Sequence, residues 1–132
     1  MAGSVRNVAV EKAYYRTTKI FPIMHTVVIR RELYEKYRWI AQSLLKAFTQ
    51  AQKKTYEYLA TSMALTTMLP WQSAHVEEAR ALLGEDWWPY GVEPNRHVLE
   101  TFLRHHHAQG LSARLLTPEE LFHPSTHQSF TI

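Results

Sequence analysis

Residues 20–30 form an apolar run that predicts a long, buried strand. Its β-branched residues, among them Ile23, Val28 and Ile29, occupy both odd and even positions. An interior strand of a sheet that is covered on both faces has this pattern. Pro22 has no backbone donor and suits the start of the strand, whereas Arg30 marks its exit into solvent. We therefore expect residues 20–30 to be the strand around which the chain folds.

A single strand cannot satisfy its own backbone groups, so this one needs neighbours. The rest of the chain offers only one weak partner, residues 5–10. Two arrangements follow from this. Either two copies pair through residues 20–30 as a homo-oligomer, or the chain belongs to a larger α/β protein. We favour the second arrangement because of the resemblance described below.

The pattern on both sides of the run predicts helices. About two turns are expected over residues 10–16, and a short turn is expected over residues 32–37. Apolar residues then recur every three or four positions from Trp39 to about Leu59, with polar residues between them and no glycine or proline. This spacing predicts a long amphipathic helix.

Three further helical segments are expected in the second half of the chain. One begins at Gln72 or Ser73 and ends before Gly84, which suits the left-handed residue after a helix. The next begins at Pro94 and closes at Gly110. Residues 117–120 have the spacing of a capping box and predict a short turn. The buried stripe of the helix that begins at Pro94 is expected to contain Val98, Leu99, Phe102 and Leu103.

Composition indicates a globular protein of one domain. The 132 residues are 45% apolar and 20% charged, with a net charge of +3 and no cysteine. No apolar run reaches the roughly 20 residues that span a bilayer, and no apolar signal core follows Met1, so we expect a cytoplasmic protein away from membranes. Lysines and arginines are scattered among acids, which argues against a nucleic-acid partner.

Histidine is the first residue type to consider for chemistry. Neighbouring residues on a helix point about 100° apart, so the run 105–107 cannot close a metal site with its own side chains, and we expect no metal. His25 differs, because strand alternation puts it on the face of Phe21 and Val27. It is either a core histidine with one hydrogen bond or a group in a ligand cleft.

Two other groups allow two interpretations each. Arg30 and Arg31 could clamp a carboxylate, or they could be surface residues at a strand exit. The aromatic residues at 87, 88 and 90 could form a stacking wall for a ligand, or they could pin a loop onto the core. Glu100 and Arg104 stand one helical turn apart and predict a surface ion pair. The sequence contains no phosphate-binding loop, nucleophile elbow or paired-cysteine motif.

Five segments resemble, in the same order, the C-terminal part of 4,5-dihydroxyphthalate decarboxylases. The likeness covers nearly the whole chain, and the most specific parts are the sequence Phe-Pro-Ile-Met-His-Thr and the later Trp-Pro-Tyr-Gly. One departure is Lys19, which stands where the family carries glycine. The segments are residues 10–15, 20–31, 68–71, 88–91 and 94–97.

The resemblance implies an α/β fold that is mostly α within this chain. It would be the C-terminal portion of a two-lobed, type 2 periplasmic-binding-protein-like fold, with one long strand followed by several helices. Residues 1–132 would then form a single partial domain that is inactive alone.

The implied reaction removes a carboxylate from 4,5-dihydroxyphthalate to give protocatechuate, without a cofactor. The resemblance makes His25 the catalytic candidate, with Thr26 and Arg30 binding the small aromatic carboxylate. Two alternatives remain open. One is a binding module for small anions, and the other is a helical interaction protein that pairs through its exposed strand.

Overall fold

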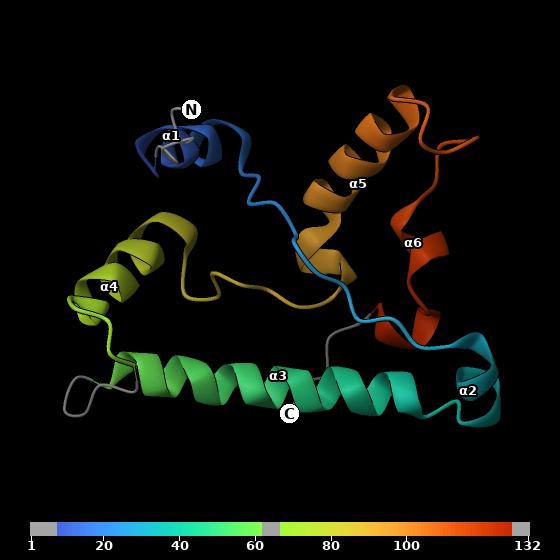
Figure 1. Ribbon diagram of the computed structural model, residues 1–132, viewed down its shortest axis with the longest axis horizontal. Helices are drawn as coiled ribbons and strands as arrows, with labels where there is room; N and C mark the ends of the chain where they lie inside the picture. The colour runs from blue at the N-terminus through green and yellow to red at the C-terminus, as the bar shows by residue number, and fades with distance from the viewer. Residues whose placement is uncertain (1–7, 62–66, 128–132) are drawn as a thin grey trace, which may run out of the picture.

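The computed structural model describes residues 8–61 and 67–127, and its regular elements are helices (Figure 1). No strand forms within these two ranges. The α-helices follow the predicted order closely, with a long connection before α2 (residues 19–30) and a short one after it (residues 37–39). The elements are α1 (Val8–Thr18), α2 (Arg31–Lys36), α3 (Ile40–Ala60), α4 (Gln72–Leu83), α5 (Val92–Ala108), α6 (Pro118–Leu121) and the 3₁₀ helix η1 (Pro124–Thr126).

The expected strand at residues 20–30 is wrong. This segment is irregular and lies largely in solvent, with side-chain exposure of 88% at Val28 and 62% at Met24. Its apolar pattern lacks a pairing partner within the described residues, because residues 8–10 of the expected partner belong to α1. Residues 5–7 lie outside the described ranges. The prediction of an α/β, two-lobed periplasmic-binding-protein-like fold is therefore also wrong for the described residues, whose regular elements are helices.

The first three helices arise from local signals and confirm the predictions for these segments. The N–H of Tyr37 donates to Leu33 O at 3.0 Å and ends α2, and α3 then runs from Ile40 to Ala60. Ala41 is the buried residue of α3. No side chain caps the start of α3. Trp39 is already in the right-handed helical region, and the Ile40 N–H donates to Tyr37 O at 3.0 Å.

Lys19 ends α1 in an unusual conformation. Its φ is +58°, and its N–H donates to Tyr15 O at 2.8 Å. A left-handed residue with this bond is the standard way to close a helix, and glycine fills the position most easily because it has no Cβ. The Lys19 ammonium also lies 5.4 Å from the centre of the Tyr15 ring. The lysine therefore occupies a position whose geometry favours glycine.

Gly84 ends α4 as predicted, with φ +96° and its N–H donating to Arg80 O at 2.9 Å. Helix α5 begins at Val92, two residues before the predicted Pro94. Asn95 stabilises this start, because its Nδ2 donates to Pro89 O at 2.7 Å and to Gly91 O at 2.9 Å. These bonds hold the preceding loop against the first turn of α5.

The apolar stripe of α5 is narrower than expected. Leu99 and Leu103 are buried as predicted, and Val98 is partly buried, but Phe102 is 57% exposed. Val92, at the start of the helix, is buried instead. The first residue of α6, Pro118, is buried as well. The closest packing of the described chain therefore lies along one narrow face of α5.

Figure 1 shows how the elements are arranged. Helix α3 runs along one side, and α4 follows it at the C-terminal end of α3. Residues 19–30 cross from α1 to α2 and pass the start of α5. Helices α5 and α6 contact each other, and η1 returns the chain to α3. Among the described helices, none is long and apolar enough to cross a bilayer.

Candidate functional site

His25, Thr26 and Arg30 all lie exposed on the segment between α1 and α2. The Arg30 carbonyl accepts the Tyr34 N–H at 3.0 Å and so begins α2. His25 is not packed among apolar side chains as strand alternation had suggested, since Phe21, Ile23 and Val27 are exposed too. The structure does not gather the three residues into one pocket, and their roles stay predictions.

A ring contact connects this segment to an aromatic cluster. The centres of the Phe21 and Trp88 rings are 5.6 Å apart, and the rings meet edge to face at 62°. Phe21 is four residues before His25. The segment that carries the predicted catalytic residue is therefore anchored beside the loop that precedes α5.

That loop and α3 line an open hollow of about 290 Å³. Residues 48, 52 and 56 recur every four positions and so lie on one face of α3. The amphipathic pattern of residues 39–59 predicted the helix but did not indicate that this face lines a site. The same four-residue spacing was the signal that could have found it. The lining consists of Phe48, Ala51, Gln52, Thr55, Tyr56, Leu59, Trp87, Trp88 and Tyr90.

Tyr56 joins the helix and the loop through a complete set of hydrogen bonds. Its hydroxyl donates to Asp86 Oδ1 at 3.0 Å and accepts from the Trp88 N–H at 3.0 Å and from Gln52 Nε2 at 3.3 Å. Gln52 Nε2 also donates to Trp88 O. Burial, and next the hydrogen bond to Asp86, raise the pKa of Tyr56 to about 12. The phenol therefore stays protonated at neutral pH.

Trp87 covers Tyr56 on one side. The two ring centres are 4.2 Å apart, and the Arg80 guanidinium lies 5.6 Å from the centre of the Trp87 ring. Both interpretations of the aromatic residues at 87–90 are thus compatible with the structure. Trp87 and Trp88 fix the loop onto α3 and the segment before α2, and with Tyr90 they also line the hollow.

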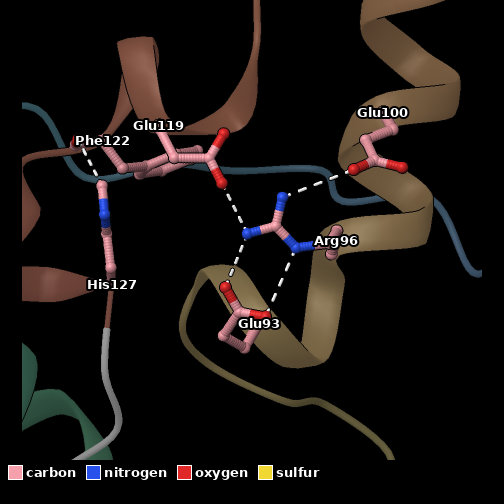
Figure 2. A network of polar contacts seen from close by, with 6 residues as sticks. All are labelled: Glu93, Arg96, Glu100, Glu119, Phe122 and His127. Carbon is pink, nitrogen blue, oxygen red and sulfur yellow. Dashed lines mark hydrogen bonds and ion pairs between the residues drawn. The ribbon is translucent and has the colours of Figure 1, made fainter.

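Arg96 organises a second polar cluster between α5 and α6 (Figure 2). Its Nη2 donates to Glu93 Oε1 at 2.6 Å and to Glu119 Oε1 at 2.5 Å, and Nη1 donates to Glu100 Oε1 at 3.4 Å. The hydrogen bonds from Arg96 lower the pKa of Glu93 and of Glu119. The predicted pair of Glu100 with Arg104 is wrong, because Glu100 pairs with Arg96.

Three other histidines make contacts that hold the structure together. His107 Nδ1 lies 3.2 Å from Ser112 O, and His97 Nε2 donates to Thr18 O at 3.0 Å, which ties α5 to α1. His123 Nδ1 accepts the Ser125 N–H at 3.1 Å, and its ring packs on Tyr34 of α2. Among the residues of the two described ranges, no group of three or more His, Cys, Asp or Glu could hold a metal ion.

Comparison with known proteins adds one relative. No family model matches the chain. Over 119 residues, which are 90% of this chain, it is 41% identical to a 4,5-dihydroxyphthalate decarboxylase of Comamonas testosteroni. The matched part is 36% of that protein, so the chain spans about a third of its relative's length. The chain is thus similar to a decarboxylase over most of its own length.

Proposed function

We propose that the chain takes part in the decarboxylation of 4,5-dihydroxyphthalate to protocatechuate. The observation that carries this proposal is the 41% identity over 119 residues to a protein of that name. Because the matched part is 36% of the relative, the proposal assigns the complete active site to this chain together with further polypeptide. By itself, the chain is expected to be inactive.

The proposed reaction exchanges a carboxylate for a proton on the ring. A ring hydroxyl para to the departing carboxylate pushes electron density to the ring carbon that bears this carboxylate. An acid protonates that carbon, and the bond to the carboxylate then breaks. Its electron pair returns to the ring as carbon dioxide leaves. The reaction needs a proton donor, a base for the hydroxyl and a clamp for the carboxylates.

In this proposal His25 transfers the proton or anchors the ring hydroxyl. Thr26 offers a hydroxyl to the substrate, and Arg30 can bind a carboxylate with two parallel hydrogen bonds. The three side chains are exposed and hence accessible to a ligand. Further polypeptide is needed to exclude water around them, because preorganised groups act most strongly in a dry site.

A chimera tests the proposal. The matched third of the Comamonas testosteroni protein is replaced by this chain, and release of carbon dioxide and protocatechuate from 4,5-dihydroxyphthalate is measured. We expect the chimera to be active and His25→Gln to reduce its kcat by 10²-fold or more, as loss of a general acid does. The matched control is His105→Gln, an exposed histidine of α5, which should leave kcat unchanged. Equal turnover in the two variants excludes the role of His25.

The competing function is a module that binds a small aromatic anion without converting it. The same chimera separates the two functions if binding and turnover are measured together. Binding of 4,5-dihydroxyphthalate that depends on Arg30, with no carbon dioxide released, supports the binding module. Release of carbon dioxide supports the decarboxylase.

The exposed apolar side chains of residues 20–30 favour a further candidate, association with a second copy of the chain. Val27 and Val28 are 65% and 88% exposed. Contact with a second copy would remove this apolar surface from water. Solution mass measured at several concentrations tests the association. A dimer that is lost in Val28→Asp supports it, and a monomer at all concentrations excludes it.

A further inference from the structure

The hollow between α3 and residues 87–90 is separate from the residues assigned to decarboxylation. None of His25, Thr26 and Arg30 is among its lining residues. We propose that this hollow binds an uncharged phenolic ring, with Gln52 as the acceptor of the phenol proton. This inference goes beyond the proposed function and does not depend on it.

The size and the walls of the hollow suit a ring. An enclosed apolar cavity of about 150 Å³ is large enough to bind benzene, and this open hollow measures about 290 Å³. Five of its lining side chains are aromatic, and such rings gain energy from stacked or edge-to-face contact with another ring. The five are Phe48, Tyr56, Trp87, Trp88 and Tyr90.

The hydrogen bonds at the wall leave one acceptor available. The amide nitrogen of Gln52 donates to the Trp88 carbonyl and to the Tyr56 hydroxyl, which fixes the orientation of the amide. A carbonyl can only accept, so this assignment of nitrogen and oxygen is set by chemistry. No donor in the described part of the chain contacts Gln52 Oε1. Tyr56 already makes three hydrogen bonds and has no capacity for a ligand.

Charge favours a neutral ring over a carboxylate. Among the described residues that line the hollow, none is lysine or arginine. Asp86 is bound to the hydroxyl of the lining residue Tyr56 and would repel an anion. Arg80 lies over the lining residue Trp87 with its Nε 3.4 Å from Glu85 Oε2, so its charge is partly compensated. A carboxylate would lose part of its hydration in the hollow without gaining a cationic partner there.

A matched pair of variants tests the site. Ala51→Leu fills the hollow from the middle of α3, whereas Ala47→Leu adds the same side chain one turn earlier, at a residue outside the lining. Binding of phenol is followed by the NMR signals of the indole N–H groups of Trp87 and Trp88. We expect Ala51→Leu to weaken binding at least tenfold and Ala47→Leu to leave it unchanged. Equal affinities in the two variants overturn the proposal.

Ligand analogues test the chemistry without altering the protein. Anisole keeps the ring but has no proton to donate, and benzoate adds a negative charge. We expect phenol to bind at least threefold more tightly than anisole and at least tenfold more tightly than benzoate. Benzoate binding as tightly as phenol overturns the proposal. Choline is a cation that aromatic side chains can bind, and choline binding more tightly than phenol overturns it as well. The measurements require no turnover, so their failure is distinct from failure of the decarboxylase proposal.

Discussion

Arg96 and Glu119 join two helices that are separated in the sequence. Arg96 Nη2 of α5 is 2.5 Å from Glu119 Oε1 of α6. The same guanidinium also binds Glu93 and Glu100, so a single cation contacts three carboxylates (Figure 2). Without it, three like charges would remain close together. The charge of Arg96 therefore contributes, together with the buried Pro118, to the position of α6 on α5.

Replacing Arg96 by methionine should lower the melting temperature at pH 7 and at low salt. The lowered pKa values of Glu93 and Glu119 mean that their contribution is complete above the ordinary value of 4.5. It is lost as the pH falls through the lowered values in the folded protein. The difference in melting temperature between wild type and Arg96→Met should therefore shrink in acid. Thermal denaturation at several pH values measures it.

The control for this prediction is Arg104→Met on the same helix. Arg104 Nη2 lies 3.4 Å from the Thr101 hydroxyl. Arg104→Met should change the melting temperature little, and this small change should not depend on pH as the effect of Arg96→Met does. An equal effect of the two substitutions contradicts the role assigned to Arg96.

Tyr56 should make stability sensitive to alkali. Its pKa rises from 10.0 to about 12 on folding, so the folded state favours the neutral phenol. That contribution is fully present below pH 10 and is lost as the pH rises through 12. Denaturant unfolding across this window should show a steeper loss of stability in wild type than in Tyr56→Phe. Parallel curves for the two proteins would contradict the coupling.

Lys19→Gly should stabilise the chain by about 0.5–1 kcal/mol. A left-handed conformation costs a residue with a Cβ about 1–2 kcal/mol, and Lys19 has φ +58°. Glycine removes this cost but loses about 0.5–1 kcal/mol through its greater freedom in the unfolded chain. Lys19→Ala is the control, since it keeps the Cβ and should bring no gain. Urea denaturation of the three proteins compares them.

Leu103 and Phe102 are neighbours on α5 with opposite environments, at 4% and 57% exposure. Leu103→Ala should cost about 2–4 kcal/mol, within the range for a buried leucine. Phe102→Ala should cost less than about 1 kcal/mol, because more than half of its surface already meets water. The free energy of unfolding of each variant decides between this arrangement and the wider stripe that the sequence suggested.

The helices could be predicted because their signals are local. Gly84 stops α4, and Thr117 begins α6 with its N–H donating to Glu120 Oε2 at 2.9 Å. Such signals act within one or two turns. The prediction of a strand at residues 20–30 was wrong because a strand also needs a neighbouring strand with which to pair. Apolar side chains alone do not supply one.

The aromatic hollow was missed for a related reason. It joins residues 48–59 of α3 to residues 87–90, and the distance along the chain hides their contact. The sequence indicated each half: the aromatic residues near Trp88, and the amphipathic helix that contains Tyr56. It did not indicate that the Tyr56 hydroxyl accepts the Trp88 N–H at 3.0 Å.

The irregular path from Phe21 to Arg30 has one further consequence. Within the described chain, these backbone amides donate to no protein atom, whereas the amides inside α3 and α5 are held by helical bonds. Deuterium should therefore replace their hydrogens within seconds, long before it enters the helices. Any molecule or chain that binds to residues 21–30 would slow this exchange. Hydrogen–deuterium exchange of a peptide that contains these residues, measured by mass spectrometry, can therefore detect the binding.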